Sequence, residues 1–115
     1  MSDILLTLLT LQNQIKLHHW QTTSFSRHKA TDDLFEKIIP LIDRFVETFQ
    51  GSHNNTIMLY KLIELKNMSE DEIVVFLTDM GKTMRQWNLE ETELDNIIQE
   101  MLEVVNVTLF LFSLN

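Results

Sequence analysis

The residues best suited to chemistry lie between positions 18 and 47. His19 and His28 stand at one end of this stretch, and Asp43 and Glu47 follow at the other, four residues apart. Imidazole nitrogens and carboxylate oxygens bind Fe(II), Zn(II) and Mn(II), and the residue types alone do not choose among these ions. The stretch therefore predicts half of a metal site.

His28 and Asp43 are too far apart to share a metal ion within one chain. They are fifteen residues apart, which is roughly 22 Å along a helix, whereas metal ligands lie about 2 Å from their ion. Both nevertheless fall on one side of a helical wheel. Two copies packed antiparallel about a twofold axis would bring His28 of one chain to Asp43 and Glu47 of the other, and symmetry would make two such sites. His19 precedes His28 by a short loop and can join the same site.

A plainer interpretation of these residues stays open. Charged side chains along one side of an amphipathic helix commonly form only its solvated face. The pattern Glu-x-x-His, which supplies the metal ligands inside single-chain di-iron bundles, is absent from the sequence. Its absence disfavours a site within one chain and leaves the site between two chains standing.

Helices must position these residues. The chain has two glycines, one proline and 44% apolar residues, a composition that suits long helices better than many strands and tight turns. Apolar residues at steps of three and four predict four long helices, over residues 3–22, 27–50, 69–86 and from 88–92 to the end of the chain. The predicted fold class is all-α, an antiparallel four-helix bundle in one domain of residues 1–115.

Local signals predict where these helices begin and end. Ser24 or Ser26 opens the second helix, and Ser69 with Glu72 forms a capping box for the third. Gly51 is expected to end the second helix. A short crossover helix is expected over residues 56–65, between the second and third long helices.

Pro40 falls inside the second helix. It either kinks the helix or stops it at Ile39, and the apolar periodicity, which continues in phase across it, favours a kink. Elsewhere, His18 is expected at the surface or the edge of the core, Tyr60 in the core, and His53 without a role.

The charge balance restricts the partners. Seventeen acidic and nine basic residues give a net charge of −8, which repels phosphate backbones, so nucleic-acid binding is not expected and cations are favoured. The absence of cysteine excludes disulfides and thiolate zinc sites. The apolar run over residues 4–11 is too short to span a bilayer and has no basic leader. We expect a cytoplasmic protein that does not associate with membranes.

Three features together resemble a known signature. They are His19-Trp20, an aromatic residue followed by His28, and the run Asp43-Arg44-Phe45-Val46-Glu47. They resemble the Dps proteins, the mini-ferritins, and the chain also looks like short Dps-like proteins of viruses and phages, which would place it in a host cytoplasm.

The resemblance implies a ferritin-like bundle whose ferroxidase site lies at a twofold dimer interface. It assigns His19 and His28 as catalytic and metal ligands from one subunit, and Asp43 and Glu47 as those from the other. Trp20 matches the tryptophan beside the site. The implied substrate is iron, with zinc or manganese as alternatives, and the implied assembly is a homo-oligomer, from a dimer to a dodecameric shell.

Two functions follow as hypotheses. The first is a ferroxidase that oxidises Fe(II), stores iron and protects against oxidative damage. The alternative is a non-catalytic helical oligomerisation or interaction protein that keeps the ferritin-like fold, with or without a structural divalent metal. Pro40 and the apolar stretch over residues 107–114 motivate the alternative.

Overall fold

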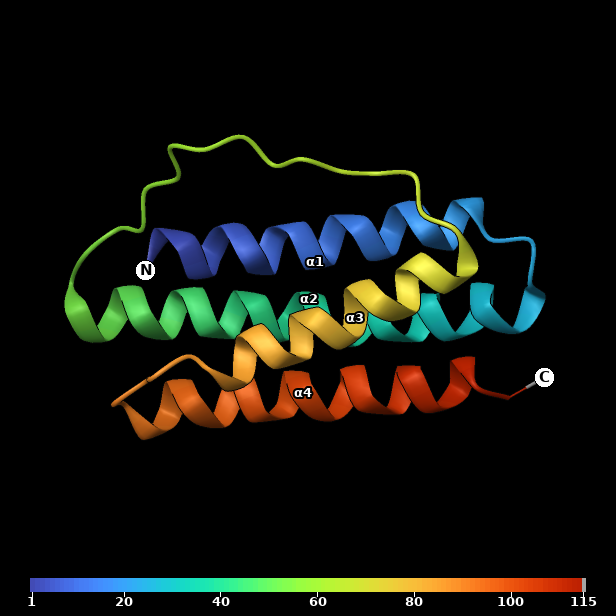
Figure 1. Ribbon diagram of the computed structural model, residues 1–115. Coiled ribbons are helices and arrows are strands. Elements are labelled where there is room, and N and C mark those ends of the chain that lie inside the picture. The colour runs from blue at the N-terminus through green and yellow to red at the C-terminus, as the bar shows by residue number, and fades with distance from the viewer. Residues whose placement is uncertain (115) are drawn as a thin grey trace.

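A computed structural model describes residues 1–114, and its regular elements are four helices. They are α1 (Ser2–Gln21), α2 (Phe25–His53), α3 (Glu70–Arg85) and α4 (Thr92–Phe112). In Figure 1, α1 and α4 run in one direction, and α2 and α3 run in the other. The prediction of an all-α chain with four long helices is confirmed.

The four helices enclose one apolar core. α2 packs against α1 and α4, and α3 packs against α4 and, less extensively, against α1. The buried positions recur at steps of three and four along each helix, so each helix turns one apolar face inward. The most deeply buried apolar side chains are Leu8, Leu11, Ile15, Leu34, Ile38, Phe45, Ile73, Leu77, Met84, Ile98, Met101 and Val105.

Serine side chains open α2 and α3. Ser24 Oγ accepts a hydrogen bond from the backbone N–H of Arg27 at 3.3 Å. Ser69 Oγ accepts from the N–H of Glu72 at 3.2 Å, and Glu72 Oε1 accepts in return from the N–H of Ser69 at 3.0 Å. These bonds satisfy N–H groups that the first turn of a helix leaves unpaired, so the predicted capping box is confirmed.

α2 is longer than the sequence pattern predicts. It continues through Pro40 and through Gly51 to His53. Asn54 follows in the left-handed region, with φ of 47°, a conformation that asparagine tolerates at helix ends. The expectation that Gly51 ends the helix is therefore wrong.

The expected crossover helix over residues 56–65 is also wrong. Residues 55–69, which we call the strap, form no helix and cross from the end of α2, past α1, to the start of α3 (Figure 1). The bundle is 45 Å long. Ten helical and five extended residues would reach only roughly 32 Å, whereas fifteen extended residues reach roughly 50 Å. An extended strap therefore reaches along the bundle from the end of α2 to the start of α3 (Figure 1).

Side chains of α1 hold the strap in place. The buried side chain of Gln14 donates from Nε2 to the carbonyl oxygen of Lys66 at 2.6 Å, and its Oε1 accepts from the N–H of Lys66 at 3.0 Å. Gln21 Nε2 donates to Asn67 Oδ1 at 2.7 Å. The amide of Gln14 thus satisfies both backbone groups of one strap residue.

Within residues 1–114, none of the helices is both long and apolar enough to cross a membrane.

Candidate metal site

His19 and His28 meet at the hairpin between α1 and α2. Only residues 22–24 separate the two helices, so the end of α1 and the start of α2 lie side by side. The two imidazole rings stack with their centroids 3.9 Å apart and their planes 19° from parallel. The structure therefore brings together the two histidines that the sequence predicts as ligands.

Reciprocal hydrogen bonds hold the two rings. His19 Nδ1 lies 2.8 Å from the carbonyl oxygen of His28, and His28 Nδ1 lies 2.8 Å from the carbonyl oxygen of His19. A carbonyl oxygen only accepts, so each Nδ1 carries the proton and donates it. In each neutral ring, Nε2 is then the atom with a free lone pair. This tautomer, held by a carbonyl, is the one that metal-binding histidines commonly adopt.

The two rings differ in exposure. His19 is 7% exposed, and its Nδ1 also lies 3.2 Å from the hydroxyl of the buried Thr31. The Thr31 hydroxyl can donate to the carbonyl of Arg27 at 2.8 Å, which leaves its oxygen free to accept from His19. His28 is exposed. The pair thus has a buried inner member, His19, and an outer member, His28, at the molecular surface.

Asp43 and Glu47 lie elsewhere on α2. Both side chains are exposed, and Asp43 is roughly 22 Å along the helix from His28. Across residues 1–114, no three His, Asp or Glu side chains of one chain gather closely enough to hold a metal ion. A site that uses all four residues therefore needs a second copy of the chain.

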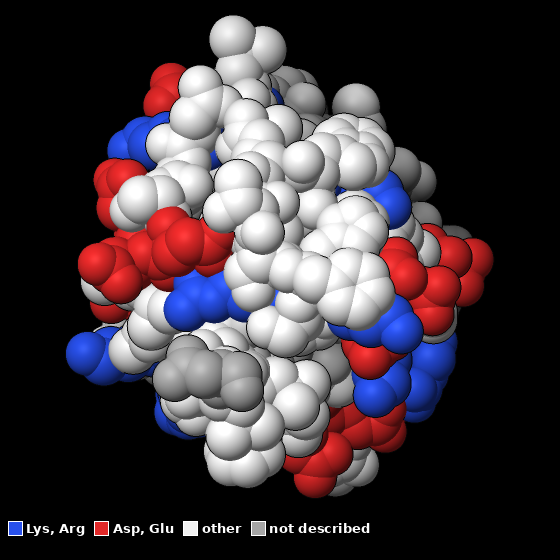
Figure 2. All heavy atoms as spheres, turned by 90° about the vertical axis from the view of Figure 1, so that its right-hand side faces the viewer, with Lys and Arg blue, Asp and Glu red and all other residues white. Residues whose placement is uncertain are grey.

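Exposed aromatic side chains surround the histidine end of the bundle. Trp20 is 67% exposed and Phe25 is 74% exposed. The ammonium groups of Lys16 and Lys29 lie 5.4 Å and 5.6 Å from their respective ring centres, within range of cation–π attraction. Figure 2 looks onto this end, where uncharged side chains cover much of the centre and both basic and acidic groups lie among and around them. Exposed aromatic rings, each with a lysine beside it, thus lie near His28.

His18 is buried, contrary to the expected surface or boundary position. It is 1% exposed, and neither ring nitrogen has a hydrogen-bond partner. Its Nε2 lies 3.4 Å from Glu70 Oε2, which also pairs with Arg27 at 2.9 Å. His18 follows the buried Ile15 by three residues, on the core face of α1. This spacing is the sequence signal that could have predicted its burial.

Burial sets the protonation of His18, since it lowers the pKa of the ring below its ordinary value, although the carboxylate of Glu70 acts to raise it. Burial also acts to raise the pKa of Glu70. A hydrogen bond from Thr22 and the charges of His18 and Arg27 outweigh that effect and lower the pKa of Glu70. The cluster favours a neutral His18 beside an ionised Glu70.

His53, for which the sequence predicts no role, joins two helices. Its Nε2 contacts Glu91 Oε1, and Ser52 Oγ donates to Glu91 Oε2 at 3.0 Å. The His53 ring stacks on Phe49, with centroids 4.2 Å apart. Glu91 precedes α4, so these contacts tie the end of α2 to the start of α4. This partner lies 38 residues away, too far for sequence spacing to reveal.

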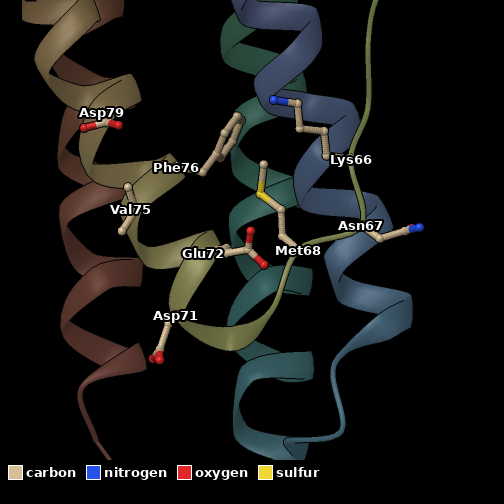
Figure 3. A pocket seen from close by; sticks show the side chains of 8 residues that line it. All are labelled: Lys66, Asn67, Met68, Asp71, Glu72, Val75, Phe76 and Asp79. Carbon is tan, nitrogen blue, oxygen red and sulfur yellow. The ribbon is translucent and has the colours of Figure 1, made fainter.

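A groove of about 410 Å³ lies between α3 and the end of the strap, away from the histidines. Figure 3 shows Met68 and Phe76 extending into the space between α3 and the strap, while Asp71 lies at its edge. None of the four predicted ligands lines this groove.

Residues 19–112 match a model described as a family of unknown function, DUF5856. The chain belongs to DUF5856. The matched range of this DUF5856 protein includes His19, His28, Asp43 and Glu47, and it leaves out most of α1. No curated protein and no solved structure matches the chain.

Proposed function

We propose that this DUF5856 protein is a Dps-like mini-ferritin that binds and oxidises Fe(II) at sites shared between two copies of the chain. His19 and His28 of one copy and Asp43 and Glu47 of the other are the proposed ligands. The observation that carries the proposal is the locked histidine pair, since both rings donate through Nδ1 to a carbonyl and keep Nε2 free.

The order and connection of the helices support a ferritin-like fold. The connections before α2 and before α4 are short, whereas the strap between α2 and α3 is long. Figure 1 shows the strap returning along the bundle, so that α2 and α3 point the same way. A bundle with one long crossover is the arrangement of ferritin-like proteins. We therefore propose an antiparallel ferritin-like bundle with an extended crossover.

The four proposed ligands suit iron as a substrate. Imidazole nitrogens and carboxylate oxygens bind Fe(II), and the same set accepts Zn(II) or Mn(II). Asp43 and Glu47 are exposed and four residues apart on one helix, so their carboxylates project from neighbouring turns. Bound between two copies, Fe(II) would give up one electron to oxygen or peroxide. The residues of this chain would hold the ion and supply negative charge that favours the ferric state.

The assembly and its location follow from the same proposal. The complete site needs a homodimer, and a larger shell would add a space for storing iron. Such a protein would act in the cytoplasm, where it would limit oxidative damage by removing Fe(II).

The first test follows ferric absorbance after Fe(II) is added in air to the wild type, to His28→Ala and to Asp43→Ala. Each variant removes a ligand from a different half of the site, so each is expected to slow oxidation at least about tenfold. Asp79→Ala is the matched control, because Asp79 is an exposed carboxylate on α3 outside the proposed site.

Equal oxidation by all four proteins would contradict the proposal. Slow oxidation in the wild type, with no change in either variant, would favour the alternative of a helical interaction protein. Mixing the two ligand variants gives a sharper result, because a mixed dimer keeps one intact site. Partial recovery on mixing is expected only if the two halves come from different chains.

A further inference from the structure

The strap exposes a row of apolar side chains. Met58, Tyr60 and Leu62 are 54%, 84% and 88% exposed, whereas Ile57 and Ile63 are partly buried. Alternate residues of an extended chain point to opposite sides, so the strap lays one side on the bundle and turns the other outward. We call Met58, Tyr60 and Leu62 the outer row. Contiguous apolar side chains of this kind mark contact surfaces.

Acidic residues are scarce around the outer row. Asp3 and Glu64 are the only acidic residues in α1 and the strap together. Lys16, Lys61 and Lys66 lie in the same two segments, so these segments carry a net charge of +1 (three lysines less two acids), in a chain with a net charge of −8. Two copies that meet on this side therefore bring little net charge together.

The one charged residue inside the row is already paired. Lys61 lies between Tyr60 and Leu62 in sequence, and its Nζ is 3.5 Å from Asp3 Oδ1 on α1. Both side chains are exposed, at 71% and 85%, so the pair is solvated and weak, and it carries no net charge. An approaching surface therefore meets three apolar side chains and one ion pair without net charge.

We propose that the outer row is a contact surface for a second copy of this chain. The two rows pack face to face about a twofold axis near Tyr60, so that each row covers the other and the contact closes on itself. A strongly acidic partner would find no net positive charge in the outer row to attract it. A second copy of the row is itself apolar and without net charge, so the two rows match in polarity and in charge. This contact uses none of the proposed metal ligands and does not depend on the proposed function.

The test is the molecular mass in solution, by sedimentation or light scattering, from micromolar to submillimolar concentrations in buffer with a chelator. The wild type is expected to gain mass as concentration rises. Leu62→Lys is expected to weaken this self-association at least about tenfold, because it places an ammonium group in the contact from both copies. Circular dichroism checks that the helices persist, which is expected since Leu62 lies outside them.

Val75→Lys is the matched control, because Val75 is 60% exposed on α3 and the substitution changes the net charge by the same amount. It is expected to associate as the wild type does. A wild type that stays monomeric throughout, equal masses for the wild type and Leu62→Lys, or the same loss in Val75→Lys would each overturn the proposal. Asp43→Ala separates the two proposals, since it removes a metal ligand and leaves the outer row intact.

Discussion

The two stacked histidines fix each other's proton positions through the backbone. His19 and His28 come from different helices, and each donates to the carbonyl oxygen of the other residue. The sequence predicts that both lie near the hairpin, because a short loop separates them. It does not predict which nitrogen stays free, because that depends on carbonyl groups whose directions the fold decides.

The position of His18 follows the helical spacing of α1. Leu8, Leu11, Ile15 and His18 follow one another at steps of three and four, and all four are buried. His18 matches no residue of the Dps signature, and a surface or boundary position was therefore expected. The periodicity was the better guide, since Glu70 and Arg27 form an ion pair next to the buried ring.

The burial of His18 predicts a pH dependence of stability. Because burial lowers the folded-state pKa below the ordinary value near 6.5, the stabilisation is fully present above that value. It is lost as the pH falls through 6.5 toward the folded-state pKa, since the unfolded chain binds the proton first. We expect the free energy of unfolding, measured by urea denaturation, to fall between neutral pH and pH of about 5.

The variant His18→Leu isolates this effect. Leucine does not titrate and suits a buried position, so the slope of stability against pH above about 5 is expected to flatten. An unchanged slope would assign the dependence to other groups. Glu70, whose pKa is lowered, contributes separately, because its stabilisation is lost only below its ordinary value of 4.5.

Helices were predictable as elements because their signals are local. The capping box at Ser69 and the apolar phase of α2 across Pro40 both appear in the structure as predicted. The strap was not predictable in this way. Its apolar residues fit a helical pattern, yet the strap runs along the bundle from the end of α2 to the start of α3. No local spacing reports where those two helix ends lie.

Pro40 predicts a gain in stability on substitution. It is exposed in the interior of α2, where proline lacks the N–H that an α-helix uses and crowds the preceding turn. We expect Pro40→Ala to raise the free energy of unfolding by about 1–3 kcal/mol, measured by chemical denaturation. A loss of stability would mean that the bundle is built around the local geometry that proline imposes. Lys82→Ala is the control, because Lys82 is exposed on α3. Gln50→Ala would not serve, because Gln50 Oε1 accepts a hydrogen bond from the N–H of Ile57 in the strap.

At the scale of the whole molecule, the two proposals use different surfaces. The proposed metal site pairs α2 of one copy with α2 of another, and the outer row pairs two straps. A chain with two distinct self-complementary contacts does not stop at a dimer, because each dimer still carries a free contact of the other kind. If both proposals hold, the particle in solution exceeds two copies, and Leu62→Lys and Asp43→Ala each reduce it to a different dimer.

The strap is also the only covalent link between two helical hairpins. One hairpin is α1 with α2, the other is α3 with α4, and they are joined in space chiefly by the packing of α2 on α4. A protease acts on extended, exposed chain, so brief digestion is expected to cut within residues 58–65 before any helix, as mass spectrometry of the products would show. The two pieces should stay together after the cut and reassemble when made separately; recovery of helical content on mixing measures this. The protein can therefore be studied as a split pair, in which the assembly of one bundle from two chains becomes a binding reaction with a measurable affinity.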